Sequence, residues 1–244
     1  MPIIRALLLL LSLTFFLWTS PAQAATRISP QLEEQVLQII RQHPEAIVES
    51  VQAYQQKIQN QLVQAQQAFV QQMKTNPDAI IAQSPITGAP AKKIILIEFS
   101  DFQCPYCAQA HKTIKEFMAK HQDEVTLVYK HFPLSSIHPE ALPAAKAAWA
   151  AGQQGKFWQY HDALFAQQNK LGEDFYLETA KNLNLDLDKF NSDRQNAEKA
   201  ITEDLILGES VGISGTPFFI MNGATFSGAV QLSDVEDVLT RVKS

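Results

Sequence analysis

The chain has 244 residues, of which 46% are hydrophobic and 18% are charged, so it can bury a full hydrophobic core without disulfide bonds. Its net charge of −5 at pH 7 argues against a nucleic-acid partner. Its only two cysteines, Cys104 and Cys107, are three positions apart, so a scaffold held by several disulfides is excluded and this pair is the candidate for chemistry.

Residues 1–24 have the pattern of a secretory signal peptide. Arg5 supplies the charged start, an uncharged apolar run follows over 6–18, and Ala22-Gln23-Ala24 is a small-x-small cleavage site. The apolar run is short for a membrane span, although an uncleaved N-terminal anchor is the alternative. We therefore expect an exported protein, located in the periplasm or an equivalent extracytoplasmic space.

Residues 25–83 form a predicted N-terminal helical region that is rich in glutamine. Pro44 is expected to start a new helix, because proline is favoured in a first turn, and a long helix is predicted from about Glu45 to Lys74. Its apolar residues form one stripe: Ile47, Val51, Tyr54, Ile58, Leu62, Ala65, Phe69 and Met73. This stripe can pack on the chain's own domain or form a homo-oligomer through residues 30–75, and both alternatives stay open.

A linker is predicted at 84–92, followed by a second domain over 93–244. A strand, a helix and a second strand are expected at 93–100, 105–121 and 125–132, which is the order of a right-handed parallel unit. An alanine-rich helical insertion is expected over about 138–211, with breaks near Gly152, Gly172 and Asp186. Two short strands joined by Asn222-Gly223 and a final helix from about Leu232, capped by Ser233, complete the prediction.

The Cys104-Pro105-Tyr106-Cys107 motif is placed where a buried strand turns into a helix. Unpaired backbone N–H groups and the helix dipole at that point stabilise a thiolate, so Cys104 is the expected nucleophile and Cys107 the expected resolving thiol. Structural zinc normally requires four ligands, and no second Cys or His pair accompanies this one, so no metal site is expected. The alternative is a thiolate copper or zinc site with His111 as third ligand.

Two further features of the sequence are candidates for the site. Glu98 interrupts an apolar strand; if it points inward, its pKa is raised and it can relay a proton to or from Cys107, whereas the alternative is an exposed edge residue. Pro217 opens a core-type strand, where it cannot donate to the sheet.

The run from Glu98 to Cys107, the Gly-Thr-Pro-Phe-Phe run at 215–219 and the helical insertion between them resemble the DsbA-like thiol:disulfide oxidoreductases of the thioredoxin superfamily. The resemblance implies an α/β thioredoxin fold, with an all-helical insertion between the CxxC-bearing βαβ unit and the cis-proline strand. It further implies a cis Thr216–Pro217 bond beside Cys104, with the Thr216 backbone available to substrate peptide, and a buried acid at Glu98. The insertion is expected to have a core of Trp149, Trp158 and Phe165.

Two features qualify what the resemblance implies. Strongly oxidising members often carry His where this chain has Tyr106, so oxidising strength stays open. The N-terminal helical region, with His43-Pro44-Glu45-Ala46, resembles the oligomerising extension of relatives linked to suppression of copper sensitivity.

The expected function is therefore disulfide formation in secreted proteins by an enzyme that needs no cofactor beyond the Cys104–Cys107 disulfide. The expected partners are reduced or unfolded secreted proteins and a membrane quinone-linked reoxidase of the DsbB or VKOR type. The alternatives are an oligomeric disulfide isomerase or reductase, and a periplasmic copper-binding or chaperone protein.

Overall fold

The computed structural model describes residues 29–244. The predicted signal peptide lies outside the described residues. The chain divides into two compact units, one ending at Lys57 and one spanning Ile58–Ser244, whereas the sequence suggested a boundary near residue 84. In the part of the chain that is described, no helix is both long and apolar enough to cross a membrane.

The first unit contains helix α2 (Pro30–Gln42) and the start of the long helix α3 (Pro44–Thr75). The Ser29 side chain caps α2 by accepting a hydrogen bond from the Leu32 backbone N–H at 3.2 Å, and Pro44 begins α3 as predicted. The large apolar side chains of this unit are solvent-exposed: Leu32, Val36, Leu37, Ile39, Ile40, Ile47, Val48, Val51 and Tyr54.

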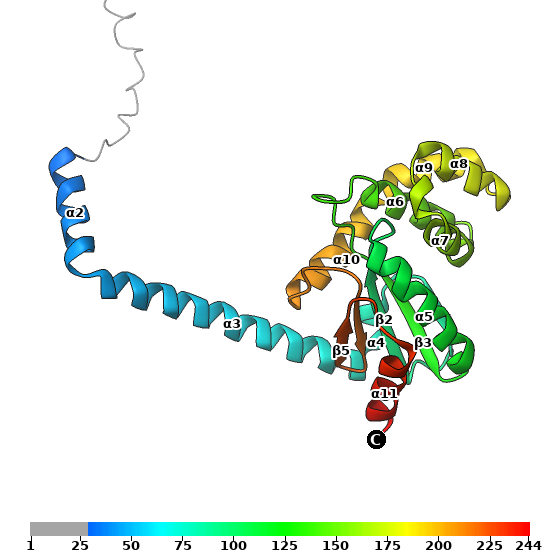
Figure 1. The fold of residues 1–244 in the computed structure, drawn as a ribbon, viewed down its shortest axis with the longest axis horizontal. Coiled ribbons are helices and arrows are strands. Elements are labelled where there is room, and N and C mark those ends of the chain that lie inside the picture. Colours follow the sequence, from blue (N-terminus) through cyan, green and yellow to red (C-terminus); the bar gives the residue numbers. More distant parts are fainter. Residues whose placement is uncertain (1–28) are drawn as a thin grey trace, which may run out of the picture. The chain divides into compact units, whose positions relative to one another are not determined.

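The second unit is built on a five-stranded sheet with the order β1-β3-β2-β4-β5 (Figure 1). The strands are β1 (Ile86–Gly88), β2 (Ile94–Ser100), β3 (Val125–His131), β4 (Phe218–Met221) and β5 (Ala224–Ser227). Among neighbouring strands of the sheet in the described residues, the pair β2–β3 is parallel and the other three pairs are antiparallel. The segment predicted as a linker at 84–92 thus contains an edge strand, which sequence reasoning missed because three residues are too few to show a period.

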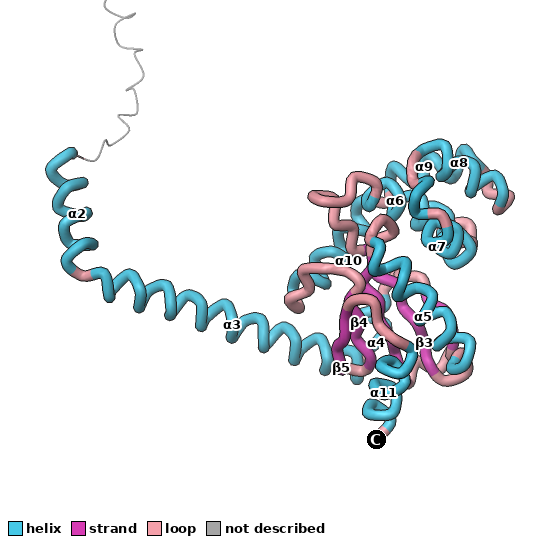
Figure 2. Tube along the Cα trace, in the orientation of Figure 1, coloured by secondary structure: helices cyan, strands magenta, loops and turns pink. Residues whose placement is uncertain are grey.

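Helices cover both faces of the sheet (Figure 2). One face is covered by α5 (Pro105–His121) and α11 (Leu232–Lys243), which pack on Leu96, Leu127 and Phe219. The other is covered by the end of α3, by α4 (Pro77–Ile81) and by α10 (Glu198–Ser210). Because side chains alternate along a strand, Glu98 of β2 points to the α5 face together with Leu96.

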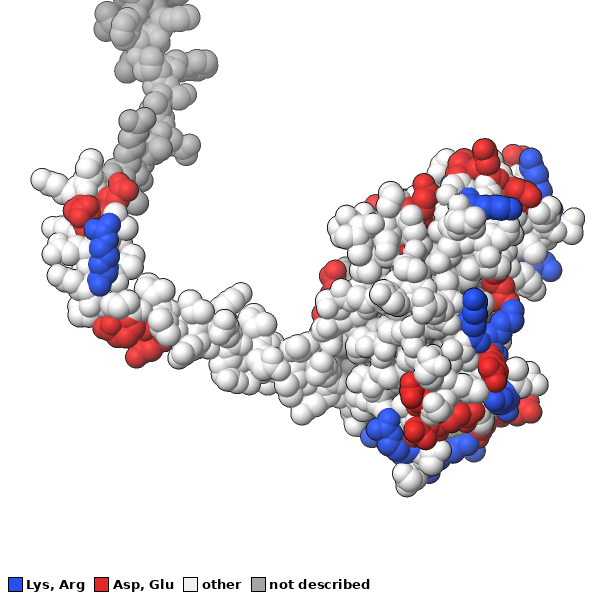
Figure 3. Space-filling model, viewed as in Figure 1, with Lys and Arg blue, Asp and Glu red and all other residues white. Residues whose placement is uncertain are grey.

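The apolar stripe of α3 has two different environments. Phe69 and Met73 are buried in the core on the α4 face of the sheet, whereas Ile58 and the stripe residues before it are exposed. Lys57 is the only charged residue between Glu49 and Lys74, and Figure 3 shows α3 largely free of charged side chains. The end of the stripe therefore packs on the chain's own domain, and its beginning stays uncovered.

The insertion is all-helical, as predicted. It consists of α6 (Ala141–Gly152), α7 (Phe157–Ala166), the short 3-10 helix η2 (Gln168–Lys170), α8 (Glu173–Asn182) and α9 (Leu187–Asn196), and it leads into α10. Its core is made by Phe165 and the alanines of α6 with Tyr160, Leu164, Tyr176 and Phe190. Trp149 and Trp158, predicted in this core, are only partly buried. The Trp158 indole N–H donates to the Ile86 carbonyl at 2.9 Å, which keeps this ring at the edge of the core.

The final hairpin and helix follow the prediction except at the helix cap. Asn222 and Gly223 form the turn between β4 and β5, both with positive φ. Gln231, not Ser233, is the N-cap of α11, because its side chain and that of Asp234 form a reciprocal capping box.

Candidate active site

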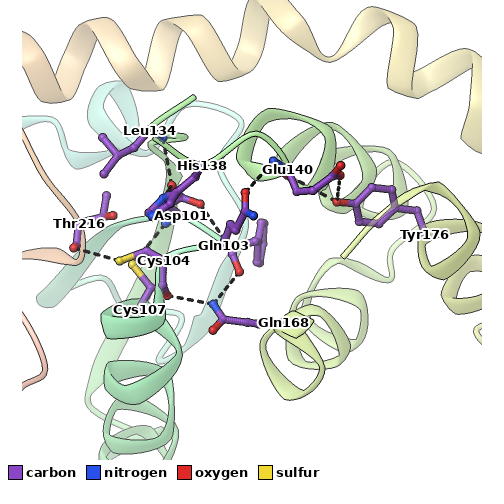
Figure 4. Close-up of polar contacts among 11 residues, drawn as sticks. Asp101, Gln103, Cys104, Cys107, Leu134, His138, Glu140, Gln168, Tyr176 and Thr216 are labelled. Atoms are coloured by element: carbon purple, nitrogen blue, oxygen red, sulfur yellow. Dashed lines mark hydrogen bonds and ion pairs between the residues drawn. The ribbon is translucent and has the colours of Figure 1, made fainter. Parts of the chain in front are cut away.

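Cys104 is the N-cap of α5, and Cys107 lies in the first turn of that helix. Both are free thiols and both are buried, so the structure represents the reduced state of the pair. The Thr216–Pro217 peptide bond is cis, as the resemblance implies, and the Cys104 thiol donates to the Thr216 carbonyl oxygen at 3.4 Å (Figure 4). The loop before β4 therefore places a backbone carbonyl directly against the expected nucleophile.

The two thiols have opposite pKa shifts. A hydrogen bond from Cys107 lowers the pKa of the Cys104 thiol to about 5, and backbone groups of the first helical turn and the Thr216 side chain act in the same direction. Burial raises the pKa of Cys107 far above its usual range. At neutral pH the reduced pair therefore carries its negative charge on Cys104, which is the form that attacks or leaves in thiol exchange.

Glu98 lies on the central strand β2 with a side chain that is 2% exposed, so the alternative of an exposed edge residue is wrong. Burial raises its pKa to about 7. Its Oε1 atom has no hydrogen-bond partner among residues 29–244. A carboxyl of this kind, on the sheet face that packs against α5, can hold or release one proton near neutral pH.

Asp101 organises the loop that leads into Cys104. Its carboxylate accepts from the Gln103 backbone N–H at 2.7 Å, from the Leu134 backbone N–H at 3.0 Å and from His138 Nδ1 at 2.7 Å. The Asp101 side chain is fully buried. It therefore ties the loop after β2 to the loop after β3, and neither it nor His138 was given a role from the sequence.

Two glutamines hold the same loop from the insertion side. Gln168 Nε2 donates to the carbonyls of Phe102 at 2.7 Å and of Cys104 at 2.9 Å. Gln103 Oε1 accepts from the Glu140 backbone N–H at 2.6 Å (Figure 4). Gln168 lies 64 positions after Cys104 and belongs to no recognisable motif, so only the fold could reveal this contact.

The other residues predicted for the site differ in their exposure to solvent. Pro105 and Tyr106 are exposed beside Cys104, with Tyr106 58% exposed, while Pro217 is buried. His111, suggested as a third ligand for a metal on the thiols, instead contacts His161, Asp162 and Phe165 of α7.

A protein-family model described as Thioredoxin matches residues 81–241. The chain belongs to the thioredoxin family. This thioredoxin-family chain is 29% identical to a thioredoxin-like oxidoreductase from Silicibacter pomeroyi DSS-3, with a TM-score of 0.63 and a match that covers 69% of this chain and 98% of that one.

Two more distant structures show the same fold. One is the thiol-disulfide exchange protein alpha-DsbA2 of Wolbachia pipientis, with 22% identity, a TM-score of 0.63 and a match that covers 72% of this chain and 97% of that one. The other is Proteus mirabilis ScsC in a transitional conformation, with 22% identity, a TM-score of 0.60 and a match that covers 88% of this chain and 96% of that one. These two likenesses show that the thioredoxin-family domain shares its fold with both proteins.

Among curated proteins, the chain is 37% identical over 158 residues to the Na(+)/H(+) antiporter NhaA 1 of Salinispora arenicola (strain CNS-205). This match covers 64% of the chain but 24% of the antiporter, so the chain spans about a quarter of the length of the curated relatives it matches. The family, the fold and the first of the solved structures together support a thioredoxin-fold oxidoreductase.

Proposed function

We propose that the chain is an exported thiol:disulfide oxidoreductase that forms disulfide bonds in secreted proteins. The observation that carries this proposal is the pairing of a low-pKa thiol, Cys104, with a buried high-pKa thiol, Cys107, beside the Thr216 carbonyl. A reduced form with a stabilised thiolate makes the corresponding disulfide easier to reduce, which is the property of a disulfide donor.

The cycle begins with the Cys104–Cys107 disulfide. A client thiolate attacks Cys104 Sγ, so that a mixed disulfide forms and Cys107 leaves as a thiolate that takes a proton from the Glu98 carboxyl. A second client thiolate then attacks the client sulfur of the mixed disulfide. Cys104 leaves as a thiolate, the client gains a disulfide, and the enzyme keeps two electrons.

The residues around Cys104 have two roles in this cycle, to bind the client peptide and to supply a proton. The Thr216 backbone accepts the extended client peptide, while exposed Tyr106 and Pro105 form the surface that meets it. Glu98 must be regenerated as a carboxylic acid before the next turnover, which its pKa of about 7 permits at neutral pH. A membrane reoxidase linked to quinone removes the two electrons and restores the disulfide.

An oligomeric isomerase is the second candidate, and the uncovered apolar side chains of α2 and the first half of α3 favour it. A second copy of the chain covers such a surface and brings two thiol pairs to one misfolded client. The two functions share the chemistry at Cys104 and differ in which redox state is maintained.

The test uses reduced ribonuclease and scrambled ribonuclease as clients of the purified mature protein. Disulfide formation in the reduced client, at the expense of the enzyme's own disulfide and absent from Cys104→Ser, supports the donor function. Reactivation of the scrambled client by the reduced protein supports the isomerase. Equal inactivity of the parent protein and Cys104→Ser toward both clients contradicts thiol exchange altogether.

A further inference from the structure

A group of potential metal ligands lies between helices α5 and α7. It consists of His111 from α5 and of His161 and Asp162 from α7, and it contains neither cysteine. One nitrogen of each imidazole and one carboxylate oxygen lie within 4.8 Å of one another. No metal site was expected from the sequence because the two cysteines lack a second pair of ligands, and the alternative joined His111 to the cysteines. His161 and Asp162 lie 50 and 51 positions after His111 and form no local motif with it.

Two of the three separations between these atoms match the spacing of ligands around a tetrahedral ion, and the third, between the two imidazole nitrogens, is within 4.8 Å. Asp162 Oδ1 lies 3.2 Å from His161 Nδ1 and 3.6 Å from His111 Nε2. Zinc holds nitrogen and oxygen ligands at about 2.0–2.2 Å, so two tetrahedral ligands lie about 3.3–3.5 Å apart. Small side-chain shifts would bring the three atoms onto one ion.

The group also borders a cavity of about 160 Å³ whose wall includes Glu98 and Trp158. His161 Nε2 and Glu98 Oε1 are buried in this wall without a hydrogen-bond partner among the residues that the structure describes. Buried polar atoms normally have a partner, so these two indicate a polar guest such as water in the cavity, while His161 Nδ1, which lies nearest Asp162, is the nitrogen that would bind the ion. Its volume admits an ion and a water molecule as fourth ligand.

The charges at the group favour a cation in one respect and oppose it in another. Burial lowers the pKa of His111 to about 4 and also lowers that of His161, so both imidazoles are neutral, which is the form that binds metals. Lys115 Nζ lies 2.5 Å from Asp162 Oδ2, which leaves Oδ1 for a metal but places a positive charge nearby.

We propose that His111, His161 and Asp162 bind a divalent metal ion of the zinc type. Two imidazoles and one carboxylate form a nitrogen and oxygen donor set without thiolate, which suits zinc better than Cu(I). The three ligands take no part in the proposed thiol exchange, although Glu98, its proton donor, lines the same cavity. Lys115 weakens the site, and its removal should strengthen it.

The test starts from the full mature chain with Cys104→Ser and Cys107→Ser, so that the thiols cannot bind metal. Isothermal titration with Zn²⁺ should show one ion per chain. In this background His111→Gln and Asp162→Asn should each weaken binding at least tenfold, and Lys115→Met should tighten it. His121→Gln is the matched control, because His121 lies on the same helix and bonds to Glu124 and Glu236 instead.

Circular dichroism of each variant verifies that the fold is retained. If His111→Gln does not fold, Asp162→Asn alone tests the site, because the Asp162 side chain is 40% exposed and its replacement should not disturb the core. Equal zinc affinity in parent, His111→Gln and Asp162→Asn overturns the proposal. So does the absence of zinc uptake by the parent at concentrations up to about 100 μM, which corresponds to a binding free energy weaker than about −5.5 kcal/mol.

Discussion

Cys104 owes its low pKa first to one neighbour, the Cys107 thiol. We therefore expect Cys107→Ala to raise the pKa of Cys104 from about 5 toward the ordinary cysteine value, because the hydrogen bond that stabilises the thiolate is gone. The rate of alkylation by iodoacetamide as a function of pH reports the thiolate fraction. An alkylation midpoint that stays near pH 5 in the variant would show that the helix and Thr216 suffice.

Glu98 makes stability depend on pH. Its carboxyl has a pKa of about 7 in the folded chain against 4.5 for the ordinary group, so its stabilising contribution is complete below pH 4.5 and is lost as the pH rises through 7. A shift of this size corresponds to about 3 kcal/mol. The Glu98→Gln side chain does not titrate. We therefore expect the unfolding free energy of this variant to increase by about 3 kcal/mol relative to that of the parent as the pH is raised from about 4.5 to about 8.

Urea unfolding of the reduced parent and the reduced Glu98→Gln variant at the two pH values measures this difference. The titration of Cys104 affects both proteins alike and cancels. If the difference in unfolding free energy is the same at both pH values, Glu98 does not titrate in this range and cannot serve as the proton donor.

At the scale of elements, the loop between β2 and α5 depends on Asp101. Its buried carboxylate accepts three hydrogen bonds, so we expect Asp101→Ala to lower the free energy of unfolding by about 2–4 kcal/mol. Asp123→Ala is the matched control, because Asp123 is exposed and its loss should change stability by less than about 0.5 kcal/mol. Denaturant unfolding measures both variants. An equally small effect in Asp101→Ala would mean that the loop does not need this network.

Elements that carry a local signal were predictable, and contacts between distant segments were not. Helix α5 follows from the CxxC position and the apolar period after Pro105, and the hairpin follows from Asn222-Gly223. Strand β1 is too short to show a pattern, and its place beside β3 is a tertiary property. The bonds from Gln168 to the active-site loop and from Asp101 to His138 join residues 37 to 66 positions apart, and neither has a motif.

At the scale of the whole molecule, the exposed apolar side chains of α2 and α3 are the basis for self-association. If a second copy covers them, we expect Val51→Glu to reduce the molar mass in solution, because it places a charge in an apolar contact. Ala53→Glu is the control, since a rotation of two residues puts Ala53 about 200° away around the helix. Light scattering of the mature protein measures both, and a parent protein that is monomeric at all concentrations would contradict self-association.

The measurement that tests thiol exchange most directly is the redox equilibrium of the Cys104–Cys107 pair with glutathione. Alkylation traps the free thiols, and mass spectrometry then measures the reduced and oxidised fractions. The stabilised Cys104 thiolate favours the reduced pair, so we expect a reduction potential less negative than about −200 mV, with a clear equilibrium between both redox forms in glutathione buffers. A potential near −270 mV, typical of a reductant, or a pair that never exchanges with glutathione, would contradict a disulfide donor.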